Sequence, residues 1–332
     1  MKARYVLLCV MALLACATEQ DRSATTAPAV PPRVAGNRLT AADERQWLDT
    51  SDLVYTSDYF SFVGRDADGF VAFALDNNRG RDGTEYQAEH YTAMHDERSG
   101  WIDVSGTGRF ENVGHELVGI PDSPFFSFTG EPTSGLRIQS SGNRLDVEIG
   151  PITDRIVDHD ARTFYALGTA PAVLRWHGRA IEGRIIYEDF VKTGFNMMTR
   201  PDLSLLSGFN GFYLLTADGG DLYLHSTKGQ GAGLPKPVLG FRVESGRSEI
   251  LQDLHLEETG HEPAWGLYLW PTSWTATWRG PEGLATLKLA MITRRGMVNW
   301  VIGGYSLSIV VGEVSYAGKV TPVYGWGELI RG

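Results

Sequence analysis

The sequence predicts an all-β protein, with two tandem antiparallel β-barrels or barrel-like sandwiches after a signal peptide and a flexible tether. Three observations predict this fold. Short runs of aromatic and β-branched residues begin near residue 52, and Gly, Asp and Asn separate them at hairpin spacing. Long helical periodicity is nearly absent. A similar closing segment occurs near residue 180 and again at the C-terminus, which indicates that one β-unit is present twice.

Residues 1–15 are typical of a signal peptide, with positive charges at Lys2 and Arg4 followed by an apolar run that is too short for a permanent membrane helix. The run ends in Leu-Leu-Ala before Cys16, a pattern that resembles the lipobox of bacterial lipoproteins. We therefore expect lipidation at Cys16 and an exported lipoprotein that faces the periplasm. Ala17 favours the outer membrane over the inner one. The alternative is an ordinary secretory peptide that is cleaved nearby.

Composition shifts divide the rest of the chain. Residues 16–40 are small, polar and rich in proline, which predicts a lipidated, flexible tether. Residues 40–48 follow with the pattern of a short capped helix. We expect the first β-domain over residues 41–195 and the second over 196–332.

Charge and cysteine content exclude several functions. The chain has 30 basic and 40 acidic residues, a formal net charge of -10, which makes nucleic acid an unsuitable partner. Of the two cysteines, Cys9 lies in the signal peptide and Cys16 would carry lipid. The mature chain would then lack free thiols, which excludes disulfides and cysteine nucleophiles. No cofactor is expected, and the composition does not define an oligomeric state.

Turn residues mark the expected hairpins. Asp66–Gly69, Asp218–Asp221 and Arg279–Gly283 each separate two runs of strand-forming residues. A fourth turn is expected at Arg294–Gly296.

The internal repeat is the strongest long-range pattern. The sequence Trp-His-Gly-Arg at 176–179 continues to Glu188, and Tyr-Ala-Gly-Lys at 316–319 continues to Glu328. The two copies align without gaps, 140 residues apart. Each copy would close one small barrel, and the two glutamates would occupy equivalent places.

These closing segments, with a glycine-rich strand that ends in glutamate, resemble those of the two-domain, lipocalin-like AttH family, which includes relatives of carotenoid 1,2-hydratases. The resemblance implies a barrel that holds a lipophilic molecule, with hydration, cyclisation or isomerisation of an alkene as chemistry. The Gly-x-Trp signature of true lipocalins is absent, as is a His-rich segment that matches the hydratases. The resemblance therefore assigns no catalytic residues.

Four polar residues, Asp76, Asn77, Arg79 and Arg81, follow a strongly apolar strand. We expect a loop at a barrel mouth, where the two arginines would bind an anionic group and the other two would provide directional hydrogen bonds. The alternative is a solvated hairpin loop without a ligand.

The segment 86–95 alternates as a strand, which places His90 on one face with Ala88 and Met94, and Glu89 on the other. Inside a barrel, burial would favour neutral His90, which could exchange protons with a substrate. We select His90 and Glu188 as candidate catalytic residues. A buried histidine and repeated glutamates with only structural roles are the alternatives.

Other clusters are weaker. His255, Glu257 and His261 have donor types that suit zinc, but an exposed acidic turn explains them better, so no metal is expected. His159, between Asp158 and Asp160, is interpreted as a surface residue. The many tryptophans of the second domain are interpreted as core, with a wall that binds an isoprenoid or a sugar as the alternative.

The leading hypothesis is a membrane-tethered protein that binds an isoprenoid-like or lipid-like small molecule, with hydratase, isomerase or cyclase chemistry on it. Two alternatives come from other classes. One is a non-catalytic lipid carrier or envelope-assembly lipoprotein, and the other is a carbohydrate-active β-sandwich.

Overall fold

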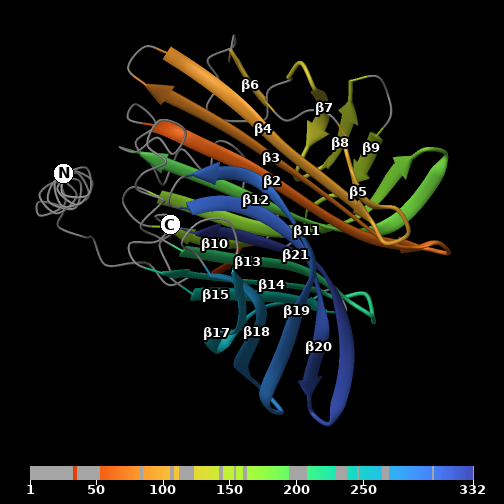
Figure 1. Ribbon diagram of the computed structural model, residues 1–332, viewed down its shortest axis with the longest axis vertical. Helices are drawn as coiled ribbons and strands as arrows, with labels where there is room; N and C mark the ends of the chain where they lie inside the picture. The colour runs from red at the N-terminus through yellow and green to blue at the C-terminus, as the bar shows by residue number, and fades with distance from the viewer. Residues whose placement is uncertain are drawn as a thin grey trace, which may run out of the picture.

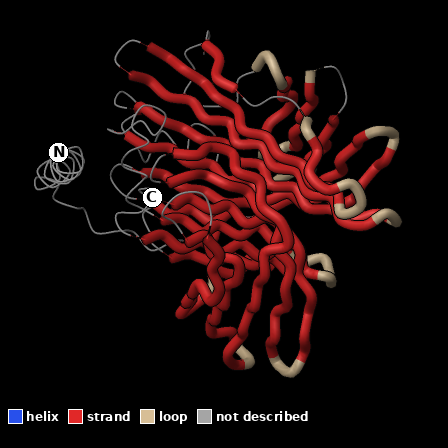
Figure 2. The backbone as a smooth tube through the Cα atoms, viewed as in Figure 1, coloured by secondary structure: helices blue, strands red, loops and turns tan. Residues whose placement is uncertain are grey.

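The computed structural model describes residues 33–35, 53–82, 85–104, 108–111, 123–141, 145–152, 155–159, 163–193, 208–228, 238–244, 247–263, 269–300 and 303–331 (Figures 1 and 2). These residues form strands and the turns between them, which confirms the all-β prediction. The described part of the chain has no helix long and apolar enough to cross a membrane. The expected signal peptide, Cys16 and the short helix at 40–48 lie outside the described residues, as does most of the tether.

The first sheet takes its strands from the N-terminal part of the described chain. They are β1 Arg33–Ala35, β2 Leu53–Asp66, β3 Gly69–Asp82, β4 Glu85–Asp96, β5 Gly100–Ile102, β6 Gly108–Glu111, β7 Phe126–Glu131, β8 Gly135–Ser140, β9 Leu145–Ile149, β10 Arg155–His159, β11 Thr163–Trp176 and β12 Arg179–Thr193. The main path of the sheet runs β5-β4-β3-β2-β12-β11-β9-β8-β7, and β1, β6 and β10 pair beside it.

The second sheet takes the rest of the described chain. Its strands are β13 Gly208–Thr216, β14 Asp221–Lys228, β15 Val238–Glu244, β16 Arg247–Ile250, β17 Gln252–Pro263, β18 Leu269–Gly280, β19 Gly283–Trp300, β20 Gly303–Tyr316 and β21 Lys319–Arg331. They run in the order β16-β15-β14-β13-β21-β20-β19-β18-β17. This order reproduces the main path of the first sheet strand for strand.

The predicted repeat is therefore a structural repeat. The hairpins β11–β12 and β20–β21 turn at His177-Gly178 and Ala317-Gly318, and all four residues have positive φ, at 49° and 79° in one turn and 50° and 77° in the other. Positive φ at both central residues defines a type I′ turn, whose twist matches that of the flanking strands. The same hairpin thus lies in the middle of the strand order of each sheet.

Two sequence expectations about turns are wrong. Residues 76–82 lie within β3, because β3 pairs with both β2 and β4 along this stretch and the sheet ladders satisfy its backbone. Arg294–Gly296 lies within β19, where irregularities between Met291 and Thr293 and between Gly296 and Val298 keep the strand paired with β20. The turns at Asp66–Gly69, Asp218–Asp221 and Arg279–Gly283 are confirmed.

Strand alternation gives each sheet two buried faces. One face of the first sheet, here called its inner face, carries Phe60, Phe73 and Ile185, which pack with residues of β7, β8 and β9 as the sheet curls. The inner face of the second sheet is packed around Trp274 and Trp278. Large side chains thus fill the middle of both inner faces, and a ligand would have to bind nearer an end of a sheet.

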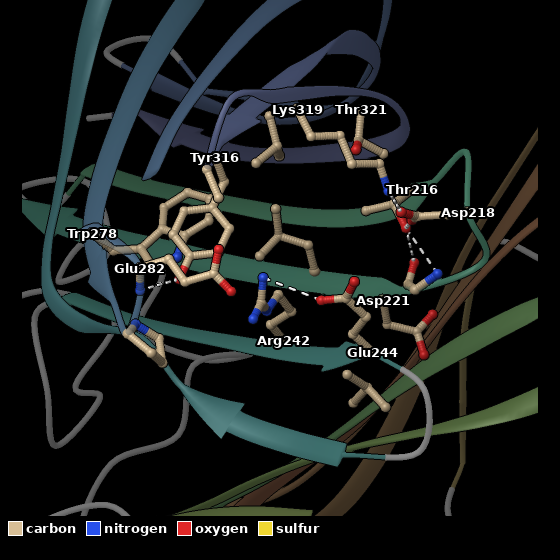
Figure 3. A pocket seen from close by; sticks show the side chains of 16 residues that line it. Thr216, Asp218, Asp221, Arg242, Glu244, Trp278, Glu282, Tyr316, Lys319 and Thr321 are labelled. Carbon is tan, nitrogen blue, oxygen red and sulfur yellow. Dashed lines mark hydrogen bonds and ion pairs between the residues drawn. The ribbon is translucent and has the colours of Figure 1, made fainter. Parts of the chain in front are cut away.

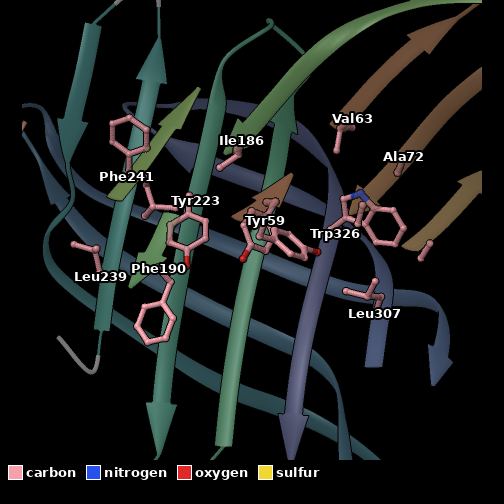
Figure 4. Close-up of a cluster of buried hydrophobic side chains, with 14 of the residues drawn as sticks. Tyr59, Val63, Ala72, Ile186, Phe190, Tyr223, Leu239, Phe241, Leu307 and Trp326 are labelled. Carbon is pink, nitrogen blue, oxygen red and sulfur yellow. The ribbon is translucent and has the colours of Figure 1, made fainter. Parts of the chain in front are cut away.

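The opposite faces of the two sheets pack against each other and are here called the interface faces. Tyr59, Ala72 and Ile186 of the first sheet lie in one cluster with Tyr223 and Trp326 of the second (Figure 4). Neighbouring residues on one strand therefore serve different environments, because one points into a half-barrel and the next points into the contact between the sheets.

Candidate functional site

A row of four polar side chains crosses the inner face of the first sheet. In the strand register, Asp189 of β12 lies opposite Asp58 of β2. Asp58 lies opposite Asn77 of β3, which in turn lies opposite His90 of β4. Side chains directly opposite each other on adjacent strands lie about 5 Å apart at Cβ. All four residues are buried. This polar row borders the apolar cluster around Phe60 and marks the polar end of the inner face.

His90 lies at one end of the polar row in an aromatic environment. Its ring centroid is 6.2 Å from that of Phe125, 5.8 Å from Phe126 and 6.3 Å from Phe128. Its Nε2 lies 2.8 Å from Asn77 Oδ1, and its Nδ1 lies 3.3 Å from Ser123 Oγ. Because Asn77 Oδ1 is an acceptor, Nε2 carries the ring proton and Nδ1 is the basic atom.

Burial sets the charge of His90. Desolvation, followed by the positive charge of Arg79, lowers the pKa of His90 from 6.5 to about 3. The ring is therefore neutral at physiological pH, in the direction that the sequence predicted. A neutral histidine can accept a proton but cannot act as a strong acid.

Asp58 is the carboxyl of the polar row that lies beside Asn77. It forms an ion pair with Arg79 and accepts a hydrogen bond of 2.5 Å from the Tyr187 hydroxyl. Desolvation raises the pKa of Asp58 to about 6, against the opposing effect of Arg79. Both protonation states of this carboxyl are therefore populated near neutral pH, as proton-transfer catalysis requires.

Hydrogen-bond donors remain unused beside these groups. Nε and Nη1 of Arg79 and Nδ2 of Asn77 are buried and have no hydrogen-bond partner among the described residues. Arg79 is 1% exposed and Asn77 is fully buried. An unsatisfied buried donor costs about 1–3 kcal/mol, so native structures almost always provide it with an acceptor. These donors are suited to bind an oxygen of a ligand.

The structure separates the four residues that were predicted to bind a ligand together. Asn77 and Arg79 belong to the polar end of the inner face, and Arg81 lies two residues further along the same face of β3, half-buried. Asp76 points to the interface face, where Ser57 donates a hydrogen bond of 2.9 Å to it. Burial there raises the pKa of Asp76 to about 7.

The two candidate catalytic residues also lie apart. His90 is on the inner face, whereas Glu188 is on the interface face, where the hydroxyl of Tyr165 donates to it at 2.7 Å. Tyr213 of the second sheet lies 2.9 Å from the same carboxylate oxygen. His90 and Glu188 therefore do not face one cavity, and the carboxyls that share the face of His90 are those of Asp58 and Asp189.

Sequence reasoning missed Asp58, Ser123 and Tyr187. Alternation could have indicated Asp58, because it is in phase with the apolar residues Phe60 and Phe62 of β2. No local signal indicated Ser123, which reaches His90 from the segment before β7 and accepts hydrogen bonds from backbone amides of its own turn.

Comparison of equivalent positions in the two sheets assigns the candidate site to the first sheet. At the positions that correspond to Asp58, Asn77 and His90, the second sheet has Asn210, Ser226 and Val238. Asn210 is bonded to Ser226 at 3.2 Å, to Glu258 at 3.0 Å, to Trp274 at 3.2 Å and to Arg331 at 2.6 Å. The amide of Asn210 is satisfied within this second network, and Val238 stands at the position of His90, so we assign the candidate site to the first sheet.

The remaining clusters have other surroundings. His261 lies 3.0 Å from Glu258, and the side chains of His255 and Glu257 are exposed on β17, the edge strand of the second sheet. Among the described residues, no group of three or more His, Cys, Asp or Glu side chains is placed to hold a metal ion. Asp158 and His159 are buried, which contradicts their interpretation as surface residues.

Comparison with known proteins identifies the fold. No protein-family model and no curated protein matches the sequence. Among solved structures, an AttH-type protein from Nitrosomonas europaea is similar with a TM-score of 0.56 and 11% identity, over 84% of this chain and 93% of that one. Kievitone hydratase from Nectria haematococca is similar with a TM-score of 0.51 and 12% identity, over 83% of this chain and 88% of that one.

The chain therefore has the two-domain, lipocalin-like fold of AttH-type proteins, as the closing segments predicted. Both solved structures are matched over most of their length, so the similarity covers the tandem arrangement and not one sheet alone.

Proposed function

We propose that the protein binds a lipophilic small molecule through an oxygen atom at the polar end of the first sheet's inner face, and that it transfers protons there. The unused donors of Arg79 and Asn77 support this proposal most directly. They lie next to a titratable carboxyl and a neutral imidazole in a mainly apolar environment. A passive apolar carrier has no need of such converging groups.

The proposed chemistry is hydration or isomerisation of an alkene. Protonated Asp58 would add its proton to one alkene carbon, and water would add to the cation at the other carbon. The proton released by that water would return to the Asp58 carboxylate, and Nδ1 of His90 would accept a hydrogen bond from the water to orient it. Low water content would protect the cation from side reactions. The presence of a hydratase among the proteins of this fold supports the reaction class.

The proposed setting is the periplasmic side of a membrane, with a lipid anchor on Cys16. The charged and apolar pattern of residues 1–15 and the Leu-Leu-Ala-Cys sequence support this part of the proposal. Mass spectrometry of the N-terminal peptide of the membrane-extracted protein tests it. The expected result is an acylated cysteine at the new N-terminus, and an unmodified peptide that begins elsewhere would contradict the anchor.

Native mass spectrometry of the full chain, released from its own membrane, tests ligand binding. The wild type should retain a small molecule, and Asn77→Ala should lose most of it. Arg137→Ala is the matched control, because Arg137 forms an exposed ion pair with Asp146 and lies on β8, a strand that contributes no residue to the polar row. Equal retention by the Asn77 and Arg137 variants would contradict the binding site.

Turnover is tested with the retained molecule as substrate. Asp58→Asn and His90→Ala should abolish conversion while binding persists, because binding is assigned to Arg79 and Asn77. If the wild type releases the molecule chemically unchanged, the protein is a carrier and the catalytic part of the proposal is wrong.

A further inference from the structure

The second sheet contains a pocket that is separate from the polar row. It has a volume of about 410 Å³ and lies where the hairpins β13–β14, β18–β19 and β20–β21 turn (Figure 3). Ligand sites commonly have volumes of about 300–1,000 Å³, so this pocket can hold a molecule of one or two rings.

The floor of the pocket is apolar. Leu222, Trp278 and Val314 line it, and all three belong to the packed inner face of the second sheet. This packing fixes their positions before any ligand binds. Leu222 and Trp278 are each 1% exposed and Val314 is 9% exposed, so they form a rigid base with little free area. The half-buried ring of Tyr316, which packs on this base, adds the apolar surface on which the CH face of a sugar ring can pack.

Ion pairs occupy most charges of the rim. Arg242 lies 3.3 Å from Glu244, and Lys319 lies 2.7 Å from Asp218. Asp221 lies 2.6 Å from Arg184 of the first sheet. An anionic ligand would have to break one of these pairs to gain a cation. The ion-paired rim therefore does not favour a ligand that carries a net charge.

The rim nevertheless provides donors and acceptors side by side. Arg242 stacks over the ring of Tyr316, with 5.7 Å from Cζ to the ring centroid, and the Tyr316 hydroxyl accepts a hydrogen bond of 2.8 Å from the Glu282 backbone amide. The carboxylate of Glu282 has no ion-pair partner among the described residues, and it lies on the same side of the pocket as Arg242 and Tyr316 (Figure 3).

We propose that this pocket binds a neutral sugar or glycosyl group. Vicinal hydroxyls both donate and accept, so they can bond to Arg242 and to Glu282 without displacing an ion pair. The apolar floor excludes a ligand that is polar on every side, and the charged rim excludes a purely apolar one. A sugar ring combines a polar edge with apolar faces and satisfies both conditions.

Saturation-transfer NMR on the full chain tests the proposal with maltose, cellobiose and N,N′-diacetylchitobiose as neutral probes. Galacturonate serves as the anionic comparison, and 1,6-hexanediol, an alkyl chain with one hydroxyl at each end, serves as the mainly apolar one without vicinal hydroxyls. At least one disaccharide should bind saturably with a dissociation constant on the order of 1 mM. Glu282→Ala, an exposed change, should weaken binding by about fivefold, or about 1 kcal/mol.

Thr321→Trp is a second variant, which fills the rim sterically and should abolish binding. Arg137→Ala on the first sheet should leave the affinity unchanged. The proposal is overturned if no disaccharide binds, if galacturonate or hexanediol binds better than every disaccharide, or if both pocket variants bind as the wild type does. These outcomes are independent of the polar row, because the site lies on the other sheet.

Discussion

Glu188 and Glu328, at equivalent positions of the two repeats, meet at the contact between the sheets, where the Tyr213 hydroxyl lies 2.9 Å from a carboxylate oxygen of each. A phenol has one proton and donates it to one carboxylate only. The second contact therefore requires a proton on the other carboxyl, which then donates to the Tyr213 oxygen. Burial accordingly raises the pKa of both glutamates, and their mutual repulsion raises that of Glu328 further.

This pair makes stability depend on pH. Because both pKa values are raised above the ordinary 4.5, the folded state holds protons that the unfolded chain releases. The stabilisation is complete below about pH 4.5 and is lost as pH rises through the raised values. Asp76, with a pKa of about 7, acts in the same direction. We expect the free energy of unfolding to fall through these groups as pH rises above about 4.5, and the contribution of Asp76 to be lost above about pH 7.

The E188Q/E328Q double variant isolates this effect. Its free energy of unfolding, from urea titrations at several pH values, should fall less steeply than that of the wild type, by up to about 1.4 kcal/mol per pH unit for each group removed. If the free energy of unfolding falls with pH at the same slope in the double variant and the wild type, the two carboxyls share no proton.

Breaking the buried Asp58–Arg79 pair should be costly. Arg79→Met leaves the Asp58 carboxyl buried without its cation, and we expect a loss of about 3–5 kcal/mol of stability. The double variant Asp58→Asn, Arg79→Met should recover part of this loss, since no charge is then buried alone. Thermal unfolding of the three proteins measures both effects. A double variant as unstable as the single one would argue against the ion pair as the cause.

His90 should not titrate near neutral pH. With its pKa lowered to about 3, the ring stays neutral from pH 8 down to pH 5, and its ring-nitrogen NMR signals should be constant over that range. The lowered pKa also means that His90 contributes to acid unfolding: its stabilisation is present above the unfolded value of 6.5 and decreases below it. Protonation of His90 at pH 6 would contradict its burial.

The closing hairpins allow a direct test of backbone strain. Gly318 has a φ of 77°, and a Cβ added there would meet nothing within 4 Å. Gly318→Ala should therefore cost only the left-handed backbone energy, about 1–2 kcal/mol. Ala317 has a φ of 50°, and Ala317→Asn should stabilise the protein slightly, because asparagine tolerates this conformation better. Thermal unfolding measures whether Gly318→Ala lowers and Ala317→Asn raises the stability. Equal changes in stability for the two variants would contradict the type I′ geometry.

Much of this architecture could be predicted from local sequence. Alternation and turn residues predict the strands, and the gapless match that ends at Glu188 and Glu328 predicts the repeat. The candidate site was predicted less well. The polar character of 76–82 predicts a loop, since a polar run normally avoids burial. In the structure, alternate residues of this run enter two different buried environments.

The sequence by itself therefore determined the fold class, the closing hairpins and the duplication, because each depends on contacts between residues close along the chain. Only the tertiary structure decided that Asp58 and Ser123 share a face with His90, and that Glu188 meets Glu328 instead. The residues brought together in this way are between 32 and 140 positions apart in the sequence. Their placement depends on how the sheets curl and pack, which local patterns do not encode.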